Sequence, residues 1–161
     1  NIIEANAARG KLQLNIQGVN SAYTGINCII RQRDSCNVLN IQDMNTEQQY
    51  LVGKYEVEIL SLPRLYFNNV IVNQSKTTNI EIPNYGTAVV SKGSGSSAIF
   101  QIKEGENIWV CDLNKNSSIS NINLLPGNYK ITFRYLRSIS TAHTIVKTFK
   151  ITSGYKENIS L

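Results

Sequence analysis

The chain has 161 residues, of which 42% are hydrophobic and 17% charged, a composition that permits a packed core and excludes a disordered chain. Its formal net charge of +5 comes from scattered basic residues, which argues against nucleic acid or an anionic membrane as the partner. Apolar runs such as "NCIIR" are far shorter than the roughly 18 to 20 residues that span a bilayer, so no transmembrane segment is predicted.

Two short stretches have weak helical character. Residues 2–9 ("IIEANAAR") have a poor helical pattern, and in residues 45–50 ("NTEQQY") Asn45 is expected to cap a single turn. No amphipathic helix is predicted elsewhere. Residues 1–9 are expected to be a linker from a preceding region.

Three cysteines, Cys28, Cys36 and Cys111, permit at most one intramolecular disulfide. Cys28 and Cys36 would be the pair if they face each other across a hairpin that turns near residues 32–34. Two buried free thiols are an equal alternative.

Residues 51–60 ("LVGKYEVEIL") have the period-two pattern of a half-buried strand. Tyr55, Val57 and Ile59 alternate with charged residues, so these three side chains are predicted to be core. Gly53 is expected to relax the limits on φ at the turn that precedes the strand.

Residues 125–134 ("LPGNYKITFR") repeat this pattern. A glycine again precedes the strand, and Pro126 beside Gly127 favours a turn. The predicted core positions of this second copy are Tyr129, Ile131 and Phe133.

The match between the two halves extends in both directions. Gly10 and its following apolar positions parallel Gly86, and "DMN" at 43–45 parallels "DLN" at 112–114. Residues 70–82 parallel residues 149–161. Offsets of 74 to 79 residues that drift only slightly indicate an internal duplication with small changes in loop length.

Each copy contains six or seven short strand patterns that are separated by turn residues, which is the spacing of a β-sandwich. We therefore predict an all-β protein with two tandem antiparallel β-sandwich repeats, of the prealbumin-like or immunoglobulin-like kind. The first repeat should cover residues 10–83 and the second residues 84–161. Pro83 cannot continue a central strand, which places the boundary near "PNYG".

The Pro-Gly-x-Tyr turn of "LLPGNYKITFR" resembles that of transthyretin-like, carboxypeptidase-regulatory-like and PEGA-type β-sandwich modules. Together with "DLNKN" and the "FKITSG" ending, residues 9–161 resemble the tandem C-terminal region of bacterial extracytoplasmic proteins with a von Willebrand factor A domain upstream. The resemblance implies a non-catalytic accessory or adhesion module, exported beyond the inner membrane. The Asp-x-Ser-x-Ser metal motif of the A domain does not occur in this sequence.

One stretch has partial similarity to a calcium loop. In "DLNKNSS" the candidate oxygen ligands Asp112, Asn114 and Asn116 alternate, but position 117 is Ser rather than Gly and position 123 is Asn rather than an acid. An Asx-turn loop is the preferred interpretation. The glycine-rich "KGSGSS" at 92–97 lacks the features of a phosphate loop and is expected to be a flexible hairpin loop.

His143 is the only histidine, and the sequence places no Ser or Asp partner beside it, so a structural role is preferred over a catalytic base. The cysteine spacing does not favour zinc. We predict neither catalysis nor a cofactor.

Exposed aromatic residues are the remaining candidates for a binding site. Tyr66, Tyr85, Tyr135 and Trp109 could form a platform for a sugar, although Trp109 shares its strand parity with Cys111 and is expected to be core. The predicted function is scaffolding, adhesion or contact with a protein partner or cell-surface component outside the cytoplasm. A carbohydrate-binding module is the main alternative, and a hydrolase that uses His143 is a third.

Overall fold

The computed structural model describes residues 7–21, 23–137, 140 and 143–161. In these ranges the regular structure consists of 14 β-strands without an α-helix, which confirms the all-β prediction. Among the same residues, no helix is long and apolar enough to cross a membrane.

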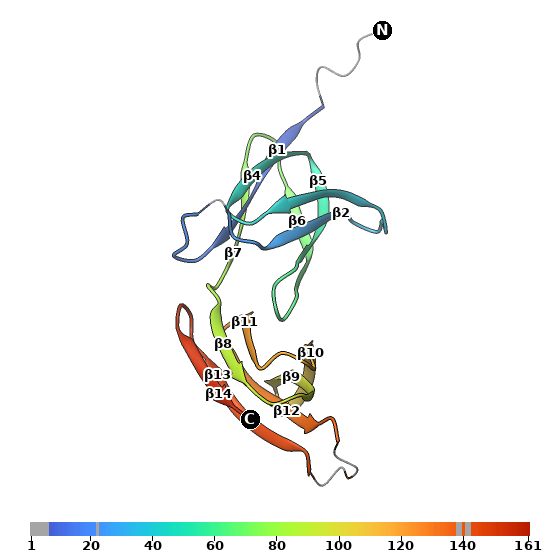
Figure 1. Cartoon of the computed structure of the whole chain (residues 1–161). Coiled ribbons are helices and arrows are strands. Elements are labelled where there is room, and N and C mark those ends of the chain that lie inside the picture. Colours follow the sequence, from blue (N-terminus) through green and yellow to red (C-terminus); the bar gives the residue numbers. More distant parts are fainter. Residues whose placement is uncertain (1–6, 22, 138–139, 141–142) are drawn as a thin grey trace. The chain divides into compact units, whose positions relative to one another are not determined.

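The chain divides into two compact units, Asn1–Ile82 (unit 1) and Pro83–Leu161 (unit 2), each with seven strands (Figure 1). The strands of unit 1 are β1 (Arg9–Ile16), β2 (Asn27–Gln32), β3 (Val38–Asp43), β4 (Thr46–Leu51), β5 (Gly53–Ile59), β6 (Leu65–Val72) and β7 (Thr77–Ile82). The strands of unit 2 are β8 (Gly86–Ser91), β9 (Gly95–Lys103), β10 (Glu106–Leu113), β11 (Ile119–Leu124), β12 (Gly127–Tyr135), β13 (Ile145–Ile151) and β14 (Lys156–Ser160).

Both units have the same topology. Unit 1 consists of a three-stranded sheet β4-β1-β7 and a four-stranded sheet β3-β2-β5-β6, and unit 2 consists of β11-β8-β14 and β10-β9-β12-β13. Each strand of unit 2 therefore occupies the place of the strand seven positions earlier. The two sandwich-like units confirm the predicted pair of β-sandwich repeats.

One strand pair in each unit departs from antiparallel pairing. The last strand lies parallel to the first, as β7 beside β1 and β14 beside β8. Parallel neighbours cannot be joined by a tight hairpin. Between the first and last strands of each unit the chain therefore passes through the four-stranded sheet. The remaining pairs are antiparallel.

The predicted core positions are confirmed by their burial. The six side chains on the inner faces of β5 and β12 have exposed fractions of 4% or less. They are Tyr55, Val57, Ile59, Tyr129, Ile131 and Phe133. Alternation along each strand places the charged neighbours on the opposite face, as the sequence pattern requires.

The glycine and tyrosine shared by the two copies form one local motif. The Tyr55 hydroxyl donates a hydrogen bond to the Leu51 carbonyl oxygen at 2.7 Å, and the Tyr129 hydroxyl donates to the Leu125 carbonyl oxygen at 2.6 Å. The two glycines have ordinary negative φ, so the φ explanation predicted from sequence is wrong. Instead, a Cβ at Gly53 would lie 3.7 Å from the Tyr55 ring, and one at Gly127 3.5 Å from the Tyr129 ring.

Gly10 and Gly86 are required by a close approach of two backbones. A Cβ at Gly10 would lie 2.1 Å from the Asn73 carbonyl oxygen, and one at Gly86 would lie 2.4 Å from the Thr152 carbonyl oxygen. Each glycine thus allows the first strand of its unit to pass the turn before the last strand. This contact explains why the sequence repeats the glycine.

The predicted helical turn at 45–50 is wrong, because Thr46–Leu51 is strand β4. Asn45 instead adopts a positive φ of 60° in the tight turn before β4. Its side chain accepts a hydrogen bond from the Ile16 amide and donates to the Val19 and Ser21 carbonyl oxygens. The other helical candidate, residues 2–9, lies mostly outside the described residues.

The edge strands β3 and β10 each contain a bulge, and the two bulges lie at equivalent positions of the two units. The pairing register shifts between Ile30 and Arg31 opposite β3, where Leu39 is the extra residue. In β10 it shifts between Trp109 and Cys111, where Val110 is the extra residue. A bulge reverses the inward and outward alternation that follows it.

The registers also correct one part of the sequence alignment. Cys28 pairs with Gln42 and with Ile59, whereas Ser97 pairs with Leu113 and with Phe133. Gln42 and Leu113 are therefore equivalent positions. Asp112 consequently occupies the place of Ile41, two residues away from the match with Asp43 that the sequence predicted.

Cys28 and Cys36 are both free. Cys28 is buried in β2 and its Sγ lies 3.2 Å from the Met44 sulfur, while Cys36 is exposed in the turn between β2 and β3. The hairpin does exist, but Cys36 lies beyond the end of β2 and cannot pair across the strands. Burial, followed by the charge of Asp43, raises the pKa of Cys28 to about 12, so this thiol stays protonated.

Candidate functional site

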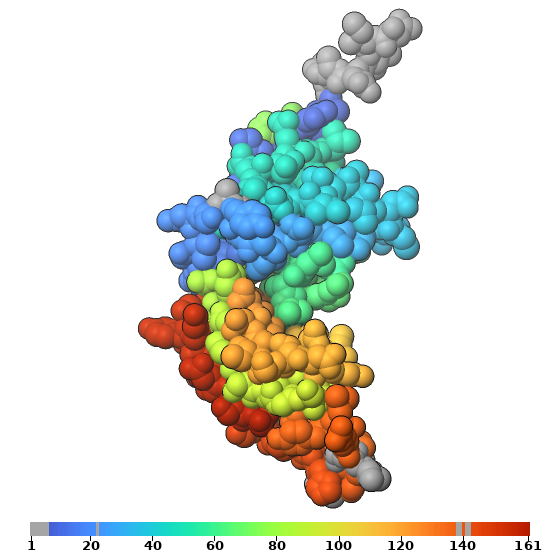
Figure 2. All heavy atoms as spheres, viewed as in Figure 1, coloured from blue at the N-terminus to red at the C-terminus, as the bar shows by residue number. Residues whose placement is uncertain are grey.

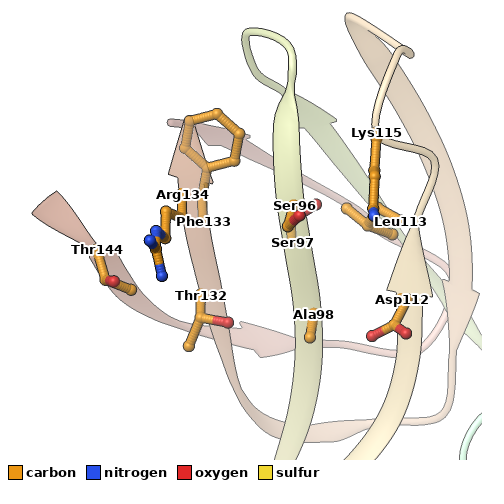
Figure 3. A pocket seen from close by; sticks show the side chains of 10 residues that line it. All are labelled: Ser96, Ser97, Ala98, Asp112, Leu113, Lys115, Thr132, Phe133, Arg134 and Thr144. Carbon is orange, nitrogen blue, oxygen red and sulfur yellow. The ribbon is translucent and has the colours of Figure 1, made fainter. Parts of the chain in front are cut away.

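The side of the four-stranded sheet of unit 2 that faces away from the core, here called the outer face of unit 2, contains a hollow of about 430 Å³. Its lining residues are Ser96, Ser97, Ala98, Asp112, Leu113, Lys115, Thr132, Phe133, Arg134 and Thr144. Figure 3 shows Asp112 and Lys115 on one side of the hollow, with Thr132, Arg134 and Thr144 on the other.

Small side chains create this hollow. Ser96 and Ala98 lie on β9 opposite Arg134 and Thr132 of β12, so the middle of the sheet surface is low between two higher rows. Sequence analysis overlooked these residues. Their signal was the run of small residues "GSSA" inside what proved to be a strand.

Trp109 is the largest exposed side chain beside the hollow, with 58% of its surface accessible. Its predicted core position is wrong, because Val110 forms the bulge and is the buried residue of this pair of neighbours. The bulge also places Trp109 and Asp112 on the same face. The Trp109 indole N–H donates a hydrogen bond to the Asp112 carboxylate at 3.0 Å, which fixes the orientation of the ring.

The three calcium candidates do not form one cluster of free ligands. Asp112 accepts the hydrogen bond from Trp109, and the Asn114 side-chain oxygen accepts one from the Asn116 amide at 3.0 Å. The second bond is an Asx-turn, the interpretation that the sequence favoured. Among the described residues, no group of three or more His, Cys, Asp or Glu side chains is placed to hold a metal.

Two of the three tyrosine candidates belong to unit 2, where they lie at opposite ends of β8. Tyr66 belongs to β6 of unit 1 and is 62% exposed. Tyr85 is half-buried just before β8, where its carbonyl oxygen accepts from the Gly154 amide. Tyr135 lies at the far end of β12 and packs edge-on against Phe133, with ring centroids 4.7 Å apart. A sugar platform that combines Tyr85 and Tyr135 of unit 2 is therefore not supported.

Lys92, which follows β8, is buried inside unit 2 and has 6% of its surface exposed. Its ammonium donates to the Asn114 carbonyl oxygen at 2.8 Å and lies 5.8 Å from the centre of the Phe133 ring. Desolvation lowers the pKa of Lys92. The predicted flexible loop at 92–97 is thus partly wrong, because β9 begins at Gly95 and Ser97 is also buried.

The two units differ in net charge. Unit 1 has seven basic and seven acidic residues, whereas unit 2 has nine basic and four acidic residues, so the whole excess of +5 belongs to unit 2. Lys130 and Lys150 lie on the outer face of unit 2, in register with Phe100 and Asn128. Within the described part of the chain, no ion pair involves either lysine.

Unit 1 carries an ion-pair cluster on the equivalent face. Glu58 lies 3.0 Å from Arg31 and 2.7 Å from Arg64, and only 8% of its side chain is exposed. Desolvation alone would raise the pKa of Glu58, but the hydrogen bonds and charges of the two arginines outweigh it and lower the pKa. The carboxylate is therefore ionised and paired.

His143 lies in an exposed turn two residues before β13. The hollow is lined by the carboxylate of Asp112, which accepts a hydrogen bond from the Trp109 indole, and by the hydroxyl groups of Ser96 and Thr132. The arrangement can bind through an aromatic ring, hydroxyl groups and positive charge.

The fold and this surface define a tandem β-sandwich module with a candidate contact face. No protein-family model matches the chain, and no curated protein matches it. Among solved structures it is similar to the Bacillus anthracis TIE protein, with 12% identity and a TM-score of 0.37, over 96% of this chain and 34% of that one. It is also similar to GBS52, the minor pilin in the Gram-positive pathogen Streptococcus agalactiae, with 9% identity and a TM-score of 0.40 over 96% and 94% of the two chains. Likenesses this weak do not establish a common function.

Proposed function

We propose that this chain is a non-catalytic, extracytoplasmic β-sandwich module of a larger protein, and that the outer face of unit 2 binds a protein partner at the cell surface. The observation that carries the proposal is the exposed ring of Trp109, which Asp112 holds in one orientation. Tryptophan is enriched among the residues that dominate binding energy at protein interfaces, and a fixed ring loses little entropy on binding.

The surroundings of Trp109 also favour protein contact. Phe100 lies directly opposite it on β9, and Lys130 follows on β12, so an aromatic pair borders a positive charge. The hollow beside them can accept a side chain of the partner. Such a mixture of aromatic centre and charged border is typical of interfaces that form and dissociate.

The resemblance of residues 9–161 to the tandem modules of von Willebrand factor A domain proteins supports export from the cytoplasm. In this proposal the upstream domain supplies any metal-dependent binding, and the present module supplies a scaffold and a second contact.

The test is binding of the fluorescently labelled chain to intact cells of the strain that produces it. We expect Trp109→Ala to reduce binding at least fivefold, because the anchor is removed while the core stays intact. Tyr23→Ala is the matched control, since Tyr23 is a 90% exposed aromatic residue of unit 1.

Two treatments of the cells identify the receptor. Protease treatment should abolish binding, while periodate oxidation of surface sugars should leave it unchanged. Binding that survives protease and is lost with periodate would support a carbohydrate receptor and contradict the proposal. Equal binding by the chain and Trp109→Ala would exclude the outer face of unit 2.

A further inference from the structure

The edge strand β3 of unit 1 exposes three large apolar side chains within four residues. Val38 is 51%, Leu39 56% and Ile41 61% exposed. β3 pairs with β2 on one side and with no other strand among the described residues. In Figure 2 the atoms of the β2–β3 hairpin, in light blue, project from unit 1.

This edge lacks the charges that usually protect such strands. Residues 35–42 contain no Asp, Glu, Lys, Arg or Pro, and Asp43 stands only at the end of β3. Natural proteins blunt open edges with lysine, proline, bulges or short strands, because an open backbone pairs readily with another strand. Here the bulge at Leu39 is the main such device.

Charge indicates which strand can occupy the edge. Two copies that approach through unit 2 bring its net charge of +5 against itself, whereas unit 1 has no net charge. An antiparallel pair of two β3 strands about a twofold axis near Asn40 would place Asp43 opposite Asn37, so no like charges would face each other.

We propose that β3 is a homotypic contact, at which the β3 strands of two copies of this chain pair antiparallel and join their four-stranded sheets. Their exposed apolar side chains then pack across the new pair. The contact is independent of the proposed partner site on unit 2, and such an edge-to-edge interface is small and therefore weak.

The experiment is sedimentation velocity of the 161-residue chain from about 10 µM to about 1 mM, a range suited to weak interfaces. We expect the mean mass to rise with concentration toward twice the monomer mass. Ile41→Lys should raise the dissociation constant at least tenfold, because it places two lysines near each other at the contact. Val38→Lys is the second variant, should the first fold poorly.

Ile108→Lys is the matched control, since Ile108 is 45% exposed on β10, the equivalent edge of unit 2. It should leave association unchanged. Hydrogen exchange should slow in β3 as concentration rises and stay constant in β10. A chain that remains monomeric throughout, or one whose association Ile108→Lys weakens and Ile41→Lys does not, would overturn the proposal. Loss of binding to cells by Trp109→Ala with normal association would concern the partner site alone.

Discussion

The two units solve the burial of a charge in opposite ways. In unit 1 the buried Glu58 accepts hydrogen bonds from two arginines. In unit 2 the buried Lys92 is surrounded by backbone carbonyl oxygens, the nearest that of Asn114, and by the face of the Phe133 ring. One charge is neutralised by opposite charges, and the other is solvated only by dipoles.

The pKa values of Glu58 and Lys92 are both lowered, but the lowering has opposite effects on the charged form of the two side chains. For the carboxyl of Glu58 a lowered pKa means that the fold favours the charged form. For the amine of Lys92 a lowered pKa means that burial disfavours the charged form. At these two positions the arginines of Glu58 outweigh desolvation, whereas the carbonyl oxygens around Lys92 do not.

Lys92 also occupies a position that is apolar in unit 1. With Gly10 equivalent to Gly86, Ile16 is the residue that corresponds to Lys92, and Ile16 is 3% exposed. In unit 1 the Asn45 side chain ties the end of β1 to the turn before β4. In unit 2 the Lys92 ammonium makes the corresponding connection to Asn114.

The largest loss of stability is expected at the equivalent glycines Gly10 and Gly86, which both units need. Gly86→Ala should destabilise unit 2, and Gly10→Ala unit 1, each by about 3 kcal/mol, because a Cβ would collide with a backbone carbonyl oxygen. Hydrogen exchange of each unit during chemical denaturation measures this. Gly53→Ala is the control, since its Cβ would meet only the Tyr55 ring at ordinary contact distance. Equal stability of Gly86→Ala and Gly53→Ala would show that the close approach is not rigid.

A smaller loss of stability is expected from a change to the ion-pair cluster of unit 1 at neutral pH. Glu58→Gln should destabilise unit 1 by about 2 kcal/mol, because two arginines lose their carboxylate. A carboxyl whose folded-state pKa is lowered contributes stability that is complete above its ordinary value of about 4.3 and is lost as the pH falls through the folded-state value. Acid titration of unfolding should therefore be flatter for Glu58→Gln. A variant with unchanged acid sensitivity would contradict the pairing.

The smallest effect is expected for Lys92→Met, which should remain within about 1 kcal/mol of the parent at neutral pH. Loss of the hydrogen bond to Asn114 is offset by removal of a poorly solvated charge. Between the lowered pKa and the ordinary lysine value, the unfolded chain binds more protons, so the parent gains stability as the pH rises there. Lys92→Met should lose that gain. Fluorescence of Trp109, the single tryptophan, follows the unfolding of unit 2. A loss as large as that for Glu58→Gln would refute the contrast.

Several features of the fold could be predicted from local pattern. The alternation around Tyr55 and Tyr129 gave the correct inner faces, because a strand with one buried side has a period of two whatever its partners are. The repeated glycines marked equivalent positions. The predicted helical turn at 45–50 is wrong because Asn45 favours both a helix cap and a positive-φ turn, and only the pairing of β4 with β1 decides between them.

The candidate site was less predictable. Trp109 was assigned to the core by its parity with Cys111, and the bulge at Val110 broke that parity. The hollow depends on Ser96 and Ala98 lying beside Thr132 and Arg134, residues that are far apart in the chain. The run "GSSA" is a local signal for small side chains, but it does not show which strand lies beside them.

The sequence by itself determined that the protein is two copies of one β-sandwich plan, because periodicity, turn residues and the duplication are properties of short segments. Tertiary structure alone decided which side chains are available for binding. A bulge reverses the alternation of the residues that follow it, so exposure of Trp109 depends on how β10 pairs with β9. Burial of Lys92 depends on Asn114 and Phe133, which other strands and turns supply.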